Sequence, residues 1–223
     1  MRKFDQIRGM ALERKGSEAA LEEAISAHDH ARDISALGDD RILAEFSKRV
    51  FQAGFNWSVI EKKWDGFEAA FHGFDIGRNA FMSDEDLDTH LQDTGIVRHA
   101  TKILSVRDNA IFLSDLAQEH GTAGRFFEDW PSSDLVGLWD VMKKRGARLG
   151  GSTGQYALRF LGKDSFILSR AVVRALSDAG VLEGKATSKG ELRKAQEAFN
   201  AWAEETGESY TRMSRILAMS VPD

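Results

Sequence analysis

Cysteine is absent from the 223-residue sequence, which excludes disulfide bonds and any zinc or iron–sulfur site that requires thiolate ligands. Proline is rare, with only 2 residues, so long helices can continue without interruption. No stretch approaches the ~18 uncharged apolar residues of a membrane span, and the first residues are charged rather than apolar. We therefore expect a cytoplasmic protein without a membrane segment, a bound metal or a cofactor, and we expect it to act as a monomer.

Apolar residues recur every three to four positions along most of the sequence, which is the spacing of one buried helix face. Leu43, Phe46 and Val50 form one such stripe, and no segment shows the sustained alternation of a strand. The sequence therefore predicts an all-α fold. Polar residues that can cap a first helical turn predict where four helices begin: Ser17, Asn56, Ser83 with Asp86 as a capping box, and Ser133.

The domain organisation is predicted to be simple. We expect one helical domain over residues 17–223, because no segment has the composition of a linker. Residues 1–16 are charged and weakly apolar, which predicts a loosely attached N-terminal arm or helix. Residues 184–190 are predicted to form a loop before another helix at 191–205.

Positive charge is concentrated in one window of an otherwise acidic sequence. The net charge is −5, yet residues 141–175 hold eight basic residues against Asp164 alone, which gives the window +7 and the remainder −12. A local basic face suits a partner with phosphate groups, because counterion release depends on the charges at the contact. A solvated helix face is the alternative explanation. The basic residues are Lys143, Lys144, Arg145, Arg148, Arg159, Lys163, Arg170 and Arg174.

Within this window, residues 143–161 form two helical runs joined by a glycine-rich turn. Glycine allows backbone N–H groups to approach a ligand closely, and the second helix points its positive N-terminus at the same place. The turn is therefore a candidate site for a DNA backbone phosphate, although a glycine turn without function remains the alternative. The residues that we expect to contact the backbone are Lys144, Arg148, Gly150, Gly151, Ser152 and Thr153.

The same segment resembles the helix-hairpin-helix element of DNA glycosylases and other non-specific DNA binders. Leu149, Gly151 and Ala157 stand at its leucine, first glycine and alanine positions, whereas Thr153 stands at its second glycine.

A wider resemblance covers residues 39 to 173. Residues 51–63, FQAGFNWSVIEKK, resemble the segment QAGLSWxxxLKKR of bacterial 3-methyladenine DNA glycosylases of the constitutive type. Residues 67–75 resemble that family's FxxxFxxFD, and residues 95–110 resemble its GIIRxxxKIxxxxxNA. Residues 143–146 repeat its KKRG at the start of the hairpin. Four blocks in the same order at compatible spacing identify the sequence as a divergent member of this family.

The resemblance implies an all-α, helix-hairpin-helix glycosylase in which two helical subdomains surround a cleft for double-stranded DNA. The implied activity is base excision repair: hydrolysis of the N-glycosidic bond of an alkylated purine such as 3-methyladenine after the nucleotide is flipped out of the duplex. Trp57 is the expected platform for the base, because an aromatic face attracts a cation such as a methylated adenine by about 0.5–2 kcal/mol. Phe51 and Gln52 are expected to line the same pocket. An ordinary core tryptophan is the alternative for Trp57.

The sequence departs from the family at pocket positions. The family holds its base with a glutamate three residues before QAG, and Arg49 stands there. A cationic base would meet a like charge at Arg49 unless this residue is paired, and Glu45, one helical turn earlier, predicts an exposed ion pair. The family's structural zinc needs cysteines that are absent, and we expect His28 and His30 to be surface histidines.

No catalytic residue can be assigned from the sequence. The wider superfamily places an activating aspartate where Ser169 stands, and serine cannot act as a carboxylate. Four other carboxylates are candidates, although each also fits an ordinary surface charge: Asp29, Glu45, Glu61 and Asp164. Two alternatives to an active glycosylase therefore remain. One is a glycosylase-fold protein with impaired catalysis that binds damaged DNA, and the other is an all-α protein-interaction domain.

Overall fold

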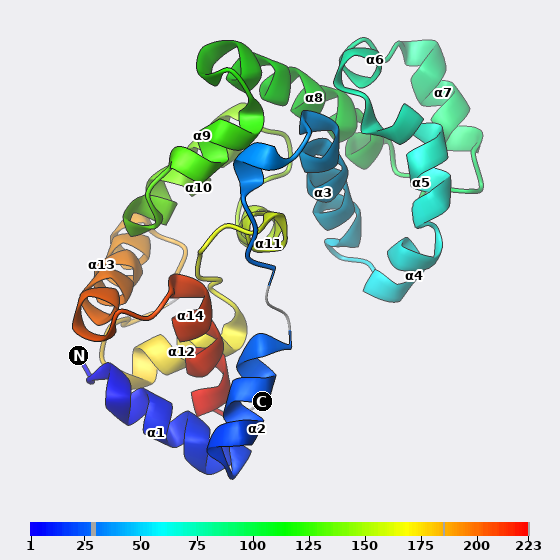
Figure 1. Ribbon diagram of the computed structural model, residues 1–223. Helices are drawn as coiled ribbons and strands as arrows, with labels where there is room; N and C mark the ends of the chain where they lie inside the picture. The colour runs from blue at the N-terminus through cyan, green and yellow to red at the C-terminus, as the bar shows by residue number, and fades with distance from the viewer. Residues whose placement is uncertain (28–29, 185, 223) are drawn as a thin grey trace. The chain divides into compact units, whose positions relative to one another are not determined.

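The computed structural model describes residues 1–27, 30–184 and 186–222, and all regular secondary structure in these ranges is helical (Figure 1). The all-α prediction is confirmed, and none of the described helices is both long and apolar enough to cross a membrane. The elements are α1 (Phe4–Lys15), α2 (Glu18–Ser26), η1 (Ile34–Ala36), α3 (Asp39–Gln52), α4 (Trp57–Lys62), α5 (Trp64–Ala70), η2 (His72–Phe74), α6 (Ile76–Ala80), α7 (Asp84–Gln92), α8 (Ala100–His120), α9 (Ala123–Asp129), η3 (Ser132–Asp134), α10 (Leu135–Arg145), α11 (Ser152–Leu161), α12 (Arg170–Asp178), α13 (Lys189–Thr206) and α14 (Tyr210–Ser220).

Three of the four predicted helix starts are confirmed. Ser17 caps α2, Asn56 caps α4, and Ser83 forms the expected capping box at α7. The prediction at Ser133 is wrong, because this residue lies inside the short helix η3. The helix that follows begins one position later than the cap signal indicated, and Asp134 accepts a hydrogen bond from Gly137 N at 3.1 Å in its first turn.

The chain divides into two compact units. Unit 1 comprises Met1–Arg32, Pro131–Leu138 and Gly162–Asp223, and unit 2 comprises Asp33–Trp130 and Trp139–Leu161. Sequence reasoning placed a single domain over residues 17–223, whereas the structure distributes this range over both units. The reason is topological, since each unit collects segments that are distant in the sequence.

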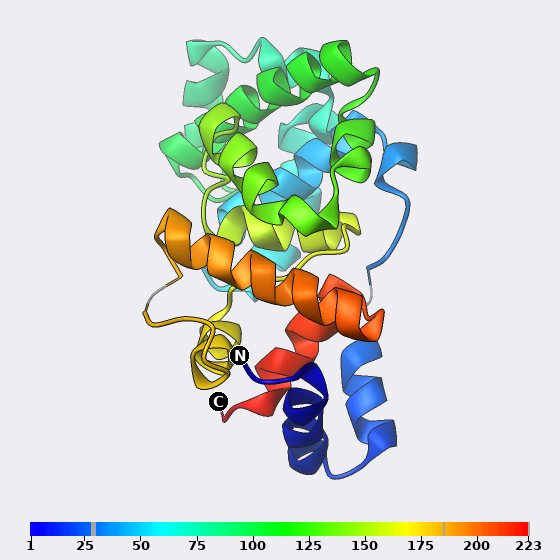
Figure 2. The same ribbon diagram turned by 90° about the vertical axis from the view of Figure 1, so that its left-hand side faces the viewer.

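In unit 1, helix α1 packs along α14 (Figure 2). Its apolar side chains Phe4 and Ile7 are buried, and the Phe4 ring lies 5.8 Å from that of Trp202. Trp202 Nε1 also donates a hydrogen bond to Arg2 O at 3.1 Å. The N-terminal segment is therefore a helix built into unit 1 and not a loosely attached arm. The many charged residues on the exposed face of α1 made its buried apolar face hard to recognise in the sequence.

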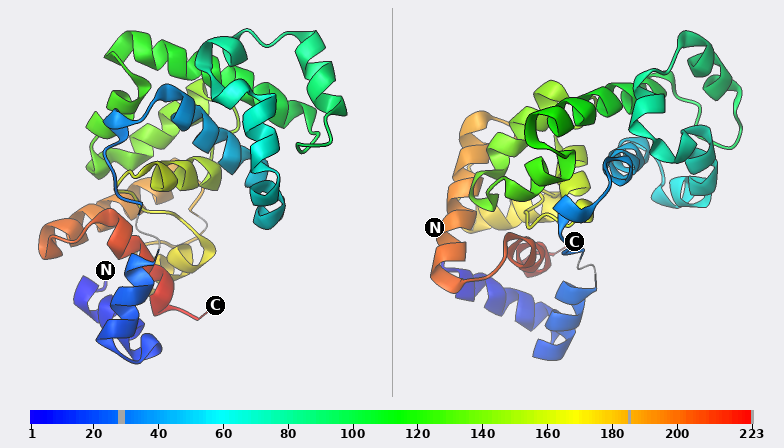
Figure 3. Two further views of the ribbon diagram at one scale, coloured as in Figure 1. Left: turned by 45° about the vertical axis from the view of Figure 1, so that its right-hand side comes forward. Right: turned by 45° about the horizontal axis from the view of Figure 1, so that its top comes forward.

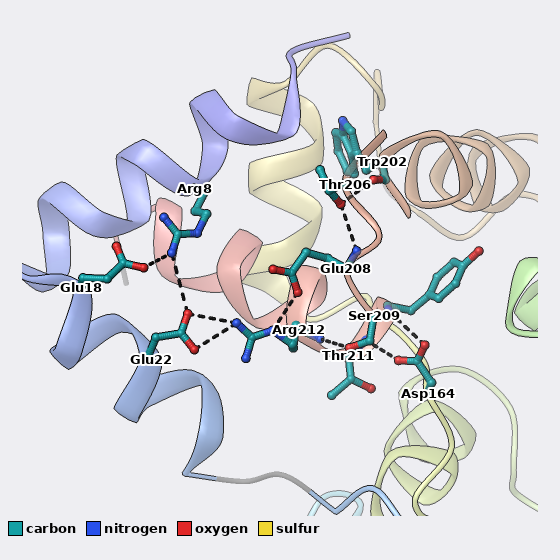
Figure 4. Close-up of polar contacts among 11 residues, drawn as sticks. Arg8, Glu18, Glu22, Asp164, Trp202, Thr206, Glu208, Ser209, Thr211 and Arg212 are labelled. Atoms are coloured by element: carbon teal, nitrogen blue, oxygen red, sulfur yellow. Dashed lines mark hydrogen bonds and ion pairs between the residues drawn. The ribbon is translucent and has the colours of Figure 1, made fainter. Parts of the chain in front are cut away.

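Charged side chains also join α1, α2 and α14 (Figure 4). Arg212 Nη2 donates to both carboxylate oxygens of Glu22 at 3.0 Å, and its Nε donates to Glu208 at 2.7 Å. Arg8 pairs with Glu18 on the same surface. Partly exposed pairs of this kind contribute about 0–1 kcal/mol each, so they orient the helices while buried apolar surface supplies most of the stability.

Helix α3 is the centre of unit 2 and packs against both α8 and α11 (Figure 3). Its aromatic side chains are buried in the core: Phe46 contacts Phe127 with ring centroids 5.6 Å apart, and Phe51 contacts Phe67 at 4.5 Å. This packing fixes the position of α3, and with it the side chains on the last turn of that helix.

Candidate functional site

The predicted hairpin is present as α10, a turn and α11, and its residues from Trp139 to Leu161 belong to unit 2. We call residues 146–151 the hairpin turn. Leu149 is buried and anchors the turn, while Asn109 of α8 holds its backbone from the side. Asn109 Oδ1 accepts a hydrogen bond from Ala147 N at 2.8 Å, and Asn109 Nδ2 donates to Ala147 O at 3.1 Å. The hairpin turn is therefore fixed to α8 and does not depend on glycine alone for its shape.

Two glycines of this hairpin meet different needs. Gly151 is exposed and adopts a left-handed conformation with φ of 61°, which a glycine adopts without strain. Gly154 is buried, and a Cβ atom there would lie 2.2 Å from Leu149 O. The close approach of the second helix to the turn therefore falls at Gly154, one residue after Thr153. The sequence comparison with the helix-hairpin-helix element did not single out Gly154.

The six residues predicted to contact a DNA backbone lie together at this turn. Lys144, Arg148, Gly151 and Ser152 are exposed, whereas Gly150 and Thr153 are half-buried. Lys144 Nζ forms an ion pair with Asp140 at 2.5 Å. Arg148 has a φ of 60° and donates from Nη1 to Thr101 Oγ1 at 3.3 Å.

The basic window of residues 141–175 is not one continuous face. Arg159 and Lys163 are buried, and residues from 162 onward belong to unit 1. Arg145 forms an ion pair with Glu119 at 2.7 Å. The positive charge that unit 2 exposes beside the hairpin turn therefore comes mainly from Lys143, Lys144 and Arg148, and the expectation of a face with eight basic residues is corrected.

Trp57 lies at the start of α4, where Asn56 caps the helix by accepting a hydrogen bond from Ser58 N. Its side chain is 42% exposed, which argues against the alternative of an ordinary core tryptophan. The indole makes edge contacts with two rings of α11, at 5.6 Å from Tyr156 and 6.3 Å from Phe160. The second helix of the hairpin thus directly supports the indole. We call Arg49, Gln52, Trp57, Tyr156 and Phe160 the Trp57 corner.

Arg49 extends from α3 into this corner and is only 5% exposed. Its guanidinium carbon lies 3.8 Å from the centre of the Phe160 ring and 5.4 Å from that of Trp57. Arg49 Nε donates to Glu45, which confirms the predicted ion pair but places it in the interior. The expectation that this pair is exposed is wrong, because the rings of Phe160 from α11 and Trp57 from α4 cover the arginine.

The polar contacts continue from Arg49 along α3 and α4. Arg49 Nη1 donates to Gln52 Oε1 at 2.7 Å, and Gln52 Nε2 donates to Glu61 Oε1 at 3.0 Å. Glu61 Oε2 pairs with Lys48 Nζ at 2.8 Å. The two acidic and two basic side chains, Glu45, Glu61, Arg49 and Lys48, balance in charge, so they form a neutral network around the buried glutamine.

Comparison with known proteins places this geometry in a family. Residues 19–139 match the family described as methyladenine glycosylase, which is more than half of the 223 residues. The chain belongs to the methyladenine glycosylase family. Its resemblance to this family, inferred from four sequence blocks, is thereby confirmed.

Individual relatives agree with this assignment. DNA-3-methyladenine glycosylase 1 of Escherichia coli (strain K12) is 33% identical over 86 residues, which are 39% of this chain and 46% of that protein. The chain thus matches about half the length of this curated relative. The crystal structure of a 3-methyladenine DNA glycosylase I is similar with a TM-score of 0.50 and 26% identity, covering 66% of this chain and 90% of that one.

The fold similarity extends further than the sequence similarity. An 8-oxoguanine glycosylase/lyase of Methanocaldococcus jannaschii, solved in complex with 15mer DNA containing 8-oxoguanine, covers 95% of both chains with a TM-score of 0.54. At 13% identity this likeness concerns the fold alone. The likeness also includes helices that lie outside the family match at residues 19–139.

The two other residues predicted for the base pocket of this methyladenine glycosylase family member are buried. Phe51 is fully enclosed and packs on Phe67, so it supports α3 from within and does not face a base. Gln52 is also buried, and both of its polar atoms are bonded to Arg49 and Glu61. Of the predicted pocket residues, Trp57 alone is substantially exposed.

Lys102 of α8 is a residue that the sequence analysis did not propose. Its ammonium group is buried and donates to Phe51 O at 3.1 Å and to Ala53 O at 2.6 Å, at the end of α3. The ring of Phe55 lies 4.4 Å away. Burial, with a smaller effect from the nearby charge of Arg148, lowers the pKa of Lys102 to about 8. A signal existed, because Lys102 shares a helix face with apolar positions of the stripe four, eight and eleven residues later, Val106, Ala110 and Leu113.

The candidate carboxylates differ in their surroundings. Glu45 and Glu61 belong to the network around Gln52 in unit 2. Asp164 lies in unit 1, where it accepts hydrogen bonds from Tyr210 N and Thr211 N and so caps α14. Ser169 caps α12 by accepting from Val172 N at 3.3 Å. Asp164 and Ser169 therefore stabilise the first turns of α14 and α12.

The histidine predictions are only partly addressed by the structure. His28 and Asp29 lie outside the described residues, and His30 is half-buried, which differs from the expected surface position. Among the described residues, no group of three or more histidine, aspartate and glutamate side chains is arranged to hold a metal ion.

Proposed function

We propose that the chain is a DNA glycosylase that hydrolyses the N-glycosidic bond of an alkylated purine of the 3-methyladenine kind after base flipping. The observation that carries this proposal is the half-exposed Trp57 supported by α11, the second helix of the glycine-turn hairpin, within one compact unit. Membership of the methyladenine glycosylase family and the similarity to DNA-3-methyladenine glycosylase 1 of Escherichia coli support this reaction class.

The hairpin turn would hold the sugar–phosphate backbone of double-stranded DNA. The N-terminus of α11 and the side chains of Lys143, Lys144 and Arg148 supply positive charge at an exposed surface. Asn109 fixes the turn in advance, so little ordering is needed on binding. These contacts position the duplex without reading its sequence.

Trp57 would stack on the flipped base, a contact that is worth about 1–3 kcal/mol per base. In the reaction the C1′–N bond breaks, the base leaves with the bonding electrons, a water oxygen bonds to C1′, and a water proton is released. Alkylation makes a purine a better leaving group, so this step demands less acid catalysis than removal of a normal base. Glu45 and Glu61 are the carboxylates of unit 2 that lie near the corner, and both are already paired with cations.

The proposal is tested by incubating the purified chain with methylated duplex DNA and measuring free base by chromatography. We expect release of methylated purine, and we expect Trp57→Ala to slow it by about 10- to 100-fold, in line with the loss of one stacking contact. Phe81→Ala is the matched control, because Phe81 is an aromatic residue of unit 2 that is 88% exposed and distant in sequence. Absence of free base with the unaltered chain, or equal rates for Trp57→Ala, would contradict the proposal.

A second function is favoured by the buried cation at Arg49. If Arg49 prevents catalysis, the chain would bind damaged DNA and leave the glycosidic bond intact. This alternative predicts binding that weakens steeply with salt but no abasic product in the same incubation.

A further inference from the structure

The segment that leads from α3 to Trp57 lies at the surface of unit 2. Residues 53–59 are all exposed, and they include Phe55, which is 41% exposed, and Trp57 itself. Gly54 adopts a left-handed φ of 76°, and a Cβ atom there would meet nothing within 4 Å. We call residues 53–56 the connector. Because exposed segments with few buried contacts open easily, the connector needs an anchor if Trp57 is to keep one position.

Lys102 of α8 anchors the connector from the interior. Its ammonium group donates to Phe51 O at 3.1 Å and to Ala53 O at 2.6 Å, and the Phe55 ring lies 4.4 Å from Nζ. The last carbonyls of a helix have no partner within that helix, and the helix dipole favours a cation beside them. Lys102 therefore fixes both the end of α3 and the first residue of the connector.

This placement of a lysine is unfavourable for stability. Lys102 is only 2% exposed, and burial of a charged group is costly unless its partners compensate for the lost water. It also lies in the first turn of α8, where the helix dipole disfavours a cation. The contacts that compensate the charge go to the end of α3 and to the connector, and the role of the charge therefore lies at that place.

We propose that Lys102 is a positioning residue for base recognition, whose charged ammonium group holds the connector so that the indole of Trp57 is in place for the extruded base. Lys102 acts through the connector, since its own ammonium group is enclosed. This inference rests on the proposed function and adds a residue to the same site.

The role of Lys102 depends on pH. Burial, with a smaller effect from the charge of Arg148 in the hairpin turn, lowers the pKa of Lys102 to about 8. The groups that face the ammonium from α3 and the connector are two carbonyls and the Phe55 ring. On α8 itself, His99 Nδ1 lies 3.2 Å from Thr101 Oγ1, which also accepts from Arg148. Above pH 8 the lysine becomes a neutral amine, and its hydrogen bonds lose the charge that makes such bonds roughly twice as strong.

The experiment compares two duplexes that differ in one base. One is undamaged, and the other carries 3-deaza-3-methyladenine, a methylated purine analogue that resists hydrolysis. Affinity for the undamaged duplex reports on the hairpin turn, whereas the ratio of the two dissociation constants reports on the Trp57 corner. For the unaltered chain we expect this preference for the methylated duplex to fall by about tenfold between about pH 7 and about pH 9.5, as Lys102 loses its proton. Release of 3-methyladenine, divided by the spontaneous rate at each pH, should fall in parallel.

Three variants separate the charge from the space that the side chain fills. Lys102→Met should have a preference that is about tenfold lower at about pH 7 and constant with pH. Lys102→Arg stays charged, so it should keep the same preference at about pH 9.5 as at about pH 7. Lys63→Met is the matched control, because Lys63 donates to Thr94 O at 2.6 Å from an exposed position. Its loss should leave the preference and the pH profile unchanged.

A second measurement does not depend on DNA. The chain labelled with 5-fluorotryptophan gives a fluorine NMR signal for Trp57, which Trp57→Phe assigns. We expect this signal to shift with a midpoint near pH 8 in the unaltered chain and to stay constant in Lys102→Met. Circular dichroism identifies a methionine variant that fails to fold, and in that case the arginine variant and the pH profiles of the unaltered chain decide.

The outcomes distinguish this inference from the proposed function. If Lys102→Met leaves the preference and the release rate unchanged, or if the Trp57 signal does not move as pH rises through 8, the inference is overturned, while base release still supports the proposed function. If no base is released and neither duplex is preferred, the proposed function fails. A Trp57 signal that titrates near pH 8 and is constant in Lys102→Met then still supports anchoring of the connector by Lys102.

Discussion

The hairpin turn and the Trp57 corner lie in the same unit, but they are built in opposite ways. Helix α11 follows the turn directly and supplies Tyr156 and Phe160 to the corner. The hairpin turn is held through its backbone: Asn109 bonds to the peptide groups of Ala147, and Gly154 permits close helix contact. Its charged side chains are left at the surface. In the Trp57 corner the polar side chains bind one another, and Arg49 and Gln52 are enclosed.

This difference distinguishes contacts that any DNA sequence can make from contacts that depend on one particular side chain. A surface that grips phosphates through backbone N–H groups and flexible cations tolerates changes of individual side chains, because every phosphate is alike. A corner in which one arginine bonds to two neighbours depends more strongly on single side chains. Under the proposed function, the hairpin turn would supply a general grip on DNA, and the corner would supply the contact with the base.

The largest effect is expected from a pair of glycine substitutions in the hairpin. Gly154→Ala places a methyl group 2.2 Å from Leu149 O, so α11 must move, and we expect the free energy of unfolding to fall by about 3 kcal/mol. Gly151→Ala meets no atom within 4 Å and suffers only the left-handed φ of 61°, which costs about 1 kcal/mol. Urea denaturation of both variants measures the difference. Equal losses would show that the turn does not depend on close backbone packing.

Lys102 connects the two regions and predicts a pH dependence. It donates to the end of α3 beneath the corner, and the charge of Arg148 in the hairpin turn contributes to lowering its pKa to about 8 from 10.5. Between these values the unfolded chain binds more protons than the folded chain, so stability rises as pH increases from 8 towards 10.5. The expected slope from this group is about 1 kcal/mol per pH unit.

Substitution isolates this contribution. Lys102→Met should lack the rise in unfolding free energy above pH 8. Lys63→Met is the control, because Lys63 also donates to a backbone carbonyl, Thr94 O at 2.6 Å, but from an exposed position. Parallel stability curves for the unaltered chain and Lys102→Met would contradict a charged, buried lysine.

Local sequence patterns predicted the framework well. The all-α class, the caps at Ser17, Asn56 and Ser83, and the hairpin at 143–161 depend on residues that are close in the sequence. The errors occur where a distant segment decides the outcome. Phe4 is buried because Trp202 packs on it, and the residues next to Phe4 in the sequence do not predict this contact.

The same reasoning explains the candidate site. Trp57 was identified through a sequence block, but the burial of Arg49 depends on Phe160, a residue of another helix more than 100 positions later. The basic window failed as a single face because residues from 162 onward enter the other unit. The carbonyl partners of Lys102, Phe51 O and Ala53 O, lie 51 and 49 positions earlier in the sequence, so no local pattern reveals them.

The smallest expected effect concerns the charges at the hairpin turn. Each phosphate contact that is lost should reduce the slope of log affinity against log salt by about 1, with a weakening that is similar for all DNA sequences. Lys143 has no ion-pair partner among the described residues, whereas Lys144 must leave Asp140 to bind a phosphate. Lys143→Ala should therefore weaken binding to undamaged duplex more than Lys144→Ala does.

Lys194→Ala is the control, because it removes a lysine of unit 1 that is paired with Glu191. It should leave both the affinity and the salt slope unchanged, because the proposed DNA contacts lie in unit 2. If all three variants keep the salt slope of the unaltered chain, the hairpin turn is not part of the DNA interface. The Trp57 corner would then lack a neighbouring contact with the DNA backbone.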